Sequence, residues 1–150
     1  GMCVNLFANH HFYWGDEHYA LTVGPDRATR MNACRTALDS GVPMAIHSDA
    51  PVTPLGPLFT AWAAINRVTA SGRIQGQEER IQVHEALWAI TMGAAYTLHL
   101  DGEIGSIETG KKADFAVLEA DPTACDPMQL KDIGVWGTVQ GGRIFPAAGL

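Results

Sequence analysis

The feature that most constrains the fold is a helix–glycine–strand order between residues 33 and 47. A helix is predicted over residues 33–39, with Asn32 as a candidate N-cap and Gly41 in the position of a C′ glycine. Residues 43–47 then form a short apolar run that indicates a buried strand. Because a strand reached directly from a helix is half of a βαβ unit, we expect a parallel sheet with helices packed outside it.

Other segments extend this α/β pattern. Residues 3–8 are apolar and predict another buried strand, and residues 9–24 predict a loop rich in histidine and aromatic side chains. Apolar residues recur at helical spacing over residues 57–69 and 83–98, which predicts two longer helices. We further expect a helical turn from Pro25, a polar surface loop over 75–82, a strand over 113–119, a short helix over 128–133, and a hairpin of 135–140 and 143–145 around Gly141 and Gly142.

Composition and charge exclude several classes of partner. The net charge is −6 and the sequence has no basic run, so neither nucleic acid nor an anionic membrane surface is expected as a partner. No apolar run approaches the roughly 18 residues that a membrane span needs. The 3 cysteines are widely spaced and form no CxxC pair, which predicts reduced thiols in a cytoplasmic protein.

Two polar residues stand at the end of the strand predicted over residues 43–47. His47 and Asp49 are two positions apart, so their side chains project to the same side of an extended chain. Parallel α/β proteins bind ligands at the carboxyl ends of their strands. An imidazole and a carboxylate there can bind zinc or a similar cation, or the carboxylate can act as a general base. The alternative is that Asp49 is a plain turn residue in segment 48–51.

Two further histidines follow the first predicted strand. His10 and His11 reach the equivalent end of the sheet, but neighbouring residues point in opposite directions, so we expect only one to face His47. The alternative is that His10 and His11 are both solvated loop residues. His18 lies in a polar stretch and is predicted to be a surface residue. A different reading of the same residues is a small zinc-binding domain that uses His10, His11, His18 and His47 together.

Two stretches of the sequence resemble the amidohydrolase superfamily, and specifically its YtcJ-like hydrolases in amidohydrolase family 3. Residues 47–51, His-Ser-Asp-Ala-Pro, are similar to the end of the eighth barrel strand of that family. Residues 105–118, GSIETGKKADFAVL, are similar to the segment in which these chains leave the barrel and rejoin a small β-sandwich. Residues 139–143 look like the last hairpin of that sandwich.

The resemblance implies an α/β fold that is the C-terminal part of a TIM-barrel metal-dependent hydrolase. Residues 1–100 would hold the last two barrel strands with their helices, and residues 101–150 the short strands of the small composite β-sandwich. The family's HxH pair, its bridging lysine or glutamate and two further histidines would all precede residue 1. We therefore expect a fragment that is inactive alone and that covers its open strand edges by forming a homo-oligomer.

The resemblance also implies a function, which is metal-dependent hydrolysis of non-peptide, amide-like carbon–nitrogen bonds in a small-molecule substrate. The family's divalent metal is usually zinc, and its strand-eight aspartate binds that metal and relays a proton from the attacking water. Asp49 matches this position and is expected to be both the catalytic residue and a metal ligand. His10 and His47 are expected to contact the substrate. The alternative function is a non-catalytic, self-associating remnant of the fold.

Overall fold

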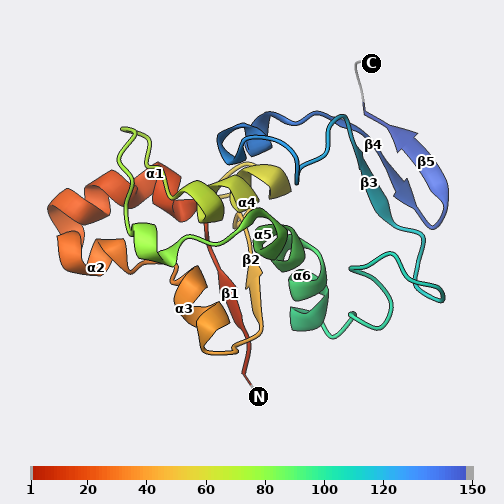
Figure 1. The fold of residues 1–150 in the computed structure, drawn as a ribbon, viewed down its shortest axis with the longest axis horizontal. Helices are drawn as coiled ribbons and strands as arrows, with labels where there is room; N and C mark the ends of the chain where they lie inside the picture. Colours follow the sequence, from red (N-terminus) through yellow and green to blue (C-terminus); the bar gives the residue numbers. More distant parts are fainter. Residues whose placement is uncertain (1, 148–150) are drawn as a thin grey trace.

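A pair of parallel strands lies at the centre of the N-terminal part of the chain (Figure 1). In the computed structural model, which describes residues 2–147, β1 (Val4–Leu6) pairs in parallel with β2 (Met44–Ile46). Helix α3 (Cys34–Asp39) leads directly into β2, and all three residues of β2 are buried. The predicted helix–strand order and the parallel pairing are therefore confirmed.

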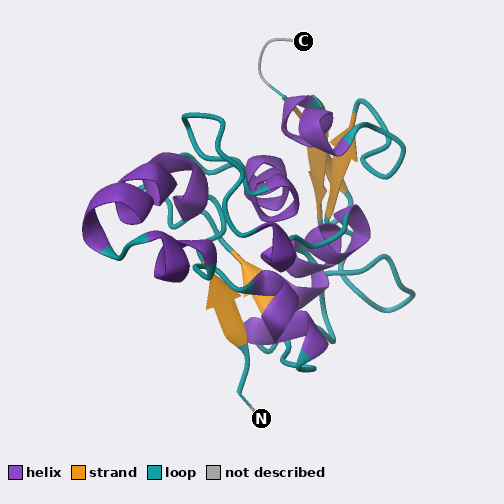
Figure 2. Cartoon of the chain, turned by 60° about the vertical axis from the view of Figure 1, so that its left-hand side comes forward, coloured by secondary structure: helices purple, strands orange, loops and turns teal. Residues whose placement is uncertain are grey.

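Helices pack around this pair of strands, while a second sheet stands apart from it (Figure 2). The helices are α1 (His10–Glu17), a π-helical turn (His18–Thr22), α2 (Pro25–Thr29), α3, α4 (Pro57–Asn66), α5 (Val83–Ile90) and α6 (Met92–Thr97), with 3₁₀ turns at Gln77–Glu79 and Pro127–Asp132. Within residues 2–147, no helix combines the length and the apolar character that crossing a bilayer requires.

The second sheet is antiparallel and confirms the strands predicted near the C-terminus. It contains β3 (Phe115–Leu118), β4 (Val135–Gln140) and β5 (Arg143–Pro146), in that order. Gly141 and Gly142 connect β4 to β5 with φ values of +55° and +80°. Glycine adopts these left-handed conformations without a steric penalty, so the glycine pair allows the tight hairpin.

Residues 9–24 are helical, so the loop predicted there is wrong. The buried face of α1 includes His11 and Gly15, and it packs against a segment far along the chain. A Cβ on Gly15 would lie 2.8 Å from Cγ2 of Thr69, so this contact requires a residue without a side chain. That face has no stripe of large apolar residues, so apolar periodicity does not predict the helix.

The single helix predicted over residues 83–98 is broken into α5 and α6. The break lies at Thr91, whose φ of −120° and ψ of −88° are not helical. It lets α6 pack directly on β2, where a Cβ on Gly93 would lie 2.2 Å from the carbonyl oxygen of Met44. The direction of this helix is therefore set by its contact with the strand rather than by its own periodicity.

The N-terminus of α3 is capped by a distant carboxylate rather than by the predicted Asn32. Ala33 occupies the N-cap position, and Asn32 lies outside the helix with a φ of +51°. The backbone N–H of Thr36 donates to the carboxylate of Glu79 at 2.9 Å, and the Thr36 hydroxyl also donates to this carboxylate. Glu79 therefore satisfies a backbone donor that the helix itself leaves free.

The segment 75–82 is half buried, although its polar composition predicts a surface loop. Gln75 is 1% exposed and Glu79 is 7% exposed. The side-chain amide of Gln75 donates to the carbonyl oxygen of Ala28 at 3.0 Å. These polar side chains are buried because they bond to the backbone of other elements.

The C-terminal residues return to the core of the N-terminal part. The indole N–H of Trp62 on α4 donates to the carbonyl oxygen of Met128 at 3.0 Å, and the amide of Asn66 donates to Pro127 at 2.9 Å. Leu130 in the same 3₁₀ turn is fully buried. The division into parts 1–100 and 101–150 remains a prediction, with this turn as a firm contact between them.

Candidate active site at the carboxyl ends of the parallel strands

The carboxyl end of β2 leads into a short turn that carries Asp49. Pairing with β1 continues one residue past the strand, since the backbone N–H of His47 donates to the carbonyl oxygen of Leu6 at 2.9 Å. The chain then turns, and the N–H of Val52 donates to the carbonyl oxygen of Asp49 at 2.8 Å. Asp49 has a φ of +55°, a left-handed conformation that aspartate and asparagine tolerate better than most residues.

Asp49 lines a pocket of about 540 Å³ at this end of the sheet. Its lining includes Asn5, His47, Ser48, Thr60 and Ile90. The Asp49 side chain is exposed, and within the part of the chain that the structure describes no group donates a hydrogen bond to its carboxylate. The backbone of Asp49 forms a turn, as the alternative interpretation predicts, but its carboxylate remains available to a ligand.

His10 and His47 both stack on Phe7, the residue that follows β1. The ring of Phe7 lies 5.0 Å from that of His10 and 5.3 Å from that of His47, with interplanar angles of 23° and 19°. Burial lowers the pKa of His10, and so does the neighbouring His18, while the Asp49 carboxylate opposes both effects. His10 is thus within electrostatic range of Asp49, and the three predicted site residues lie at one edge of the sheet.

A buried chain of hydrogen bonds holds the Asp49 turn, and no sequence motif indicated it. The Asn9 amide donates to the Thr53 hydroxyl at 2.9 Å, and that hydroxyl donates to the carbonyl oxygen of Ser48. Asn9 and Thr53 are almost completely buried, at 0% and 2% exposure. Because these hydrogen bonds join the segment after β1 to the segment after β2, they hold Ser48, the residue just before Asp49, in position.

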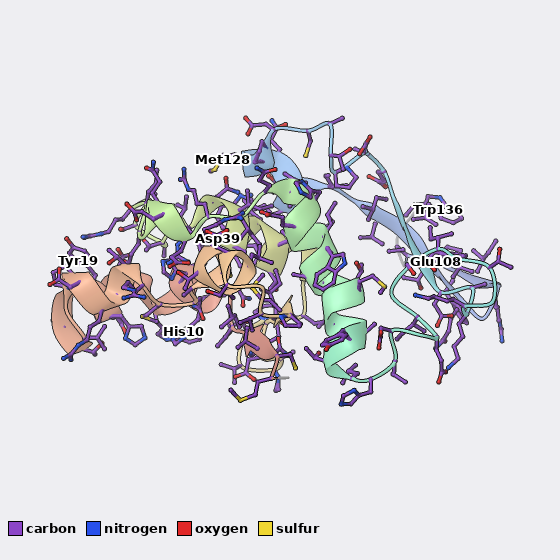
Figure 3. All side chains as sticks on the ribbon, turned by 60° about the horizontal axis from the view of Figure 1, so that its bottom comes forward. His10, Tyr19, Asp39, Glu108, Met128 and Trp136 are labelled. Carbon is purple, nitrogen blue, oxygen red and sulfur yellow. The ribbon has the colours of Figure 1, made fainter. Side chains whose placement is uncertain are left out.

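His18 contacts His10, although the sequence interpretation places it on the surface. Their Nε2 atoms lie 3.1 Å apart, and the ring of Trp14 lies 4.9 Å from the ring of His10. Figure 3 labels His10 at the start of α1 and Tyr19 just beyond its end. The spacing of His10, Trp14 and His18 by four residues is the helical signal that could have revealed this face.

His11 has a structural position, and it diverges from His10 as expected for neighbouring residues. It is 1% exposed, and its Nε2–H donates to the carbonyl oxygen of Gln75 at 2.9 Å. Burial lowers the pKa of His11 to about 4, and the positive charge of Arg67 adds to this effect. The imidazole is therefore neutral near pH 7 and occupied by a backbone contact.

The four-histidine zinc site is not formed. Within residues 2–147, no three histidine, cysteine, aspartate or glutamate side chains are arranged to hold a metal ion. His11 is turned into the protein, away from the pocket that His47 lines.

Comparison with known proteins decides the family. The sequence model of the amidohydrolase family matches residues 1–146. The chain belongs to the amidohydrolase family. It is 33% identical over 147 residues to YtcJ of Bacillus subtilis, an amidohydrolase by name. This alignment covers 95% of this chain and 28% of the relative. It is 31% identical over 127 residues to the N-substituted formamide deformylase of Arthrobacter pascens, covering 85% of this chain and 23% of the enzyme.

Two solved hydrolase structures share the fold of this chain. An uncharacterized metal-dependent hydrolase from Pyrococcus horikoshii superimposes with a TM-score of 0.67 at 20% identity, over 84% of this chain and 26% of that one. An amidohydrolase from Thermotoga maritima superimposes with a TM-score of 0.58 at 25% identity, over 76% of this chain and 26% of that one. This amidohydrolase chain thus spans about a quarter of the length of the two curated relatives named above, 28% and 23%.

Proposed function

We propose that this chain is the C-terminal part of a metal-dependent hydrolase that acts on non-peptide, amide-like carbon–nitrogen bonds. Residues 1–100 would supply the last two strands of a TIM barrel with their helices, and residues 101–150 the short strands of a small β-sandwich. The observation that carries the proposal is the free carboxylate of Asp49, which lines the pocket at the carboxyl end of β2. This is the end of a parallel strand at which α/β barrels bind their ligands.

The chemistry of Asp49 fits one ligand of a divalent metal, and zinc is the ion we propose. Its carboxylate is exposed and accepts no hydrogen bond from the described residues, so its oxygens are available. The other ligands would come from outside these 150 residues, because residues 2–147 contain no complete set. When bound, such a metal makes water a better nucleophile and polarises the scissile carbonyl group.

The residues of this chain would then have separate tasks. Asp49 would accept a proton from the attacking water at a carboxylate oxygen and return it to the departing nitrogen. His10 and His47 would contact the substrate, since both rings are held on Phe7 at the same end of the sheet. The hydrogen bonds from Asn9 through Thr53 to Ser48 would keep the Asp49 turn in place.

The names of two relatives support the bond type. One is named as a formamide deformylase and another, 37% identical over 76 residues, as a guanine deaminase. A deformylase and a deaminase both break carbon–nitrogen bonds outside peptides. We extend only this shared chemistry to the present protein.

Replacement of Asp49 by asparagine in the full-length protein tests the proposal. Asparagine tolerates the same left-handed backbone, so the fold should persist while the basic carboxylate is lost. We expect kcat/KM to fall about 100-fold or more for any formamide, cyclic amidine or aminopurine that the wild type hydrolyses. The matched control is Asp39→Asn, at a side chain that is 64% exposed on α3 and does not line the pocket.

Two results would contradict this assignment. An Asp49→Asn enzyme with the wild-type rate and an unchanged circular dichroism spectrum would remove Asp49 from the mechanism. An equal loss of activity in Asp39→Asn would show that the effect is not specific to the pocket.

Exposed apolar side chains favour self-association of the isolated chain. We propose that the isolated chain behaves as a self-associating, non-catalytic remnant of the fold. Trp136 on β4 and Phe145 on β5 are 41% and 40% exposed, and Ile144 is 57% exposed. Figure 3 shows Trp136 in the three-stranded sheet, far from His10. Light scattering on the purified chain should give a homo-oligomer without hydrolytic activity, and a monomer at micromolar concentration would contradict this.

A further inference from the structure

Two imidazole rings converge on one face of the helical segment that follows β1. His10 is the first residue of α1, and His18 is the first residue of the π-helical turn that continues it. Eight residues of helix rise about 12 Å, so the two rings must lean toward each other along the helix to meet. They meet beside Trp14, and their Nε2 atoms lie 3.1 Å apart.

This separation suits chelation of a metal ion. With metal–nitrogen bonds of about 2.05 Å, two nitrogens 3.1 Å apart subtend an angle of about 98° at the metal. The tetrahedral angle lies only slightly above this value, so a small movement of either ring would complete the geometry. Both histidines are half-buried, so the ion and its remaining water ligands have access from solvent.

A third residue contacts the other ring nitrogen of His18. Its Nδ1 lies 2.7 Å from the hydroxyl oxygen of Thr22, at the other end of the π-helical turn. When His18 Nδ1–H donates to this hydroxyl, the lone pair of His18 Nε2 faces His10 and accepts its Nε2–H, which is the proton that a metal ion would replace. A partner on the second ring nitrogen is characteristic of histidines that bind metals.

We propose that His10 and His18 form a two-histidine site for a borderline divalent cation such as Zn²⁺, with Thr22 as the outer partner. This site is distinct from the metal site proposed at Asp49. Within the described residues no third histidine, cysteine or carboxylate joins the pair, so water fills the remaining coordination positions. Binding moves the proton shared between the two Nε2 atoms to Nδ1 of His10 through solvent, and no net proton is released.

Calorimetric titration of the purified, chelator-treated chain with zinc chloride tests the site. We expect one ion per chain, and at least tenfold weaker binding in His10→Gln and in His18→Gln. The Thr22→Val variant should weaken binding about tenfold through loss of the outer partner. His84→Gln is the matched control, because His84 is exposed at the start of α5 and should bind no ion of its own.

The variant Asp49→Asn separates this site from the proposed catalytic one. Unchanged zinc affinity in Asp49→Asn, with loss in His18→Gln, supports the two-histidine site whether or not the hydrolase proposal is correct. Loss of binding in Asp49→Asn with retention in His18→Gln would overturn the inference and leave the hydrolase proposal in place.

Imidazole ¹⁵N spectra of the wild-type chain give a readout that needs no variant. Addition of one equivalent of zinc should shift the Nε2 resonances of His10 and His18 and leave those of His11 and His84 unchanged. A spectrum in which His10 and His18 do not respond would mean that their contact is an ordinary hydrogen bond and would overturn the proposal.

Discussion

Arg67 is the buried charge on which the packing of the N-terminal helices depends, and its replacement by methionine should destabilise the protein by about 3–5 kcal/mol. The residue is only 2% exposed. Its guanidinium group donates hydrogen bonds to four backbone carbonyl oxygens, those of Gln75 at 2.8 Å, Met31 at 2.8 Å, Asn32 at 3.0 Å and Thr29 at 3.1 Å.

The magnitude follows from these four bonds. A hydrogen bond from a charged donor contributes about 1.5–3 kcal/mol, so the set has a ceiling of about 6–12 kcal/mol. Methionine has no charge to desolvate, and this offsets several kcal/mol of the loss. Burial lowers the pKa of Arg67, which is the expected consequence of that desolvation. The remainder is the cost of leaving the carbonyl oxygens of Thr29 and Met31 without this donor, since those of Gln75 and Asn32 still accept from His11 and from the N–H of Cys34.

Urea denaturation followed by tryptophan fluorescence measures the change in the free energy of unfolding. Arg67→Lys should lose nearly as much as Arg67→Met, because one ammonium group cannot reach four carbonyl oxygens. Arg27→Met is the control at an exposed arginine of α2, and its change should stay within about 0.5 kcal/mol. If Arg67→Met lies within 1 kcal/mol of the wild type, the reasoning from buried carbonyl groups is refuted.

Two other perturbations follow from the same structure. The folded-state pKa of His11, about 4, lies below its unfolded value of 6.5. The free energy of unfolding should therefore be at its full value above pH 6.5 and decrease as the pH drops toward 4, because the unfolded state binds the proton first. The free energy of unfolding should decrease by about 3 kcal/mol in total. If a His11→Gln variant shows the same pH dependence in acid denaturation, His11 is not the group responsible. Gly93→Ala should cost about 3 kcal/mol or more, since its Cβ would lie 2.2 Å from the carbonyl oxygen of Met44. The control is Gly102→Ala, because Gly102 is exposed and a Cβ there would meet no other atom. Equal melting temperatures for the two variants would show that α6 does not depend on the close contact between Gly93 and Met44.

The sequence predicts those residues of the candidate site that follow the two parallel strands. His47 and Asp49 follow an apolar run, and His10 follows another, so parallel pairing was enough to bring these residues to one edge. His18 could not be placed in the same way, because its contact with His10 depends on a helix whose buried face contains His11 and Gly15. A glycine and a histidine do not form an apolar stripe, and the helix is stabilised by a distant loop.

The sequence alone determined the two strands of the parallel pair, the helices α3 and α4 and the C-terminal hairpin, since each has a clear pattern in its own stretch of chain. Apolar periodicity, glycine positions and the polar residues that end strands are local properties, and they are readable without coordinates. Only the tertiary structure decided where α5 ends, how α3 is capped and which polar residues are buried. Glu79 caps a helix formed 43 residues earlier, and Gln75 contacts a histidine 64 residues before it. Such pairings are chosen by the packing of the whole chain, because each buried polar group needs a partner and the local sequence does not specify which one.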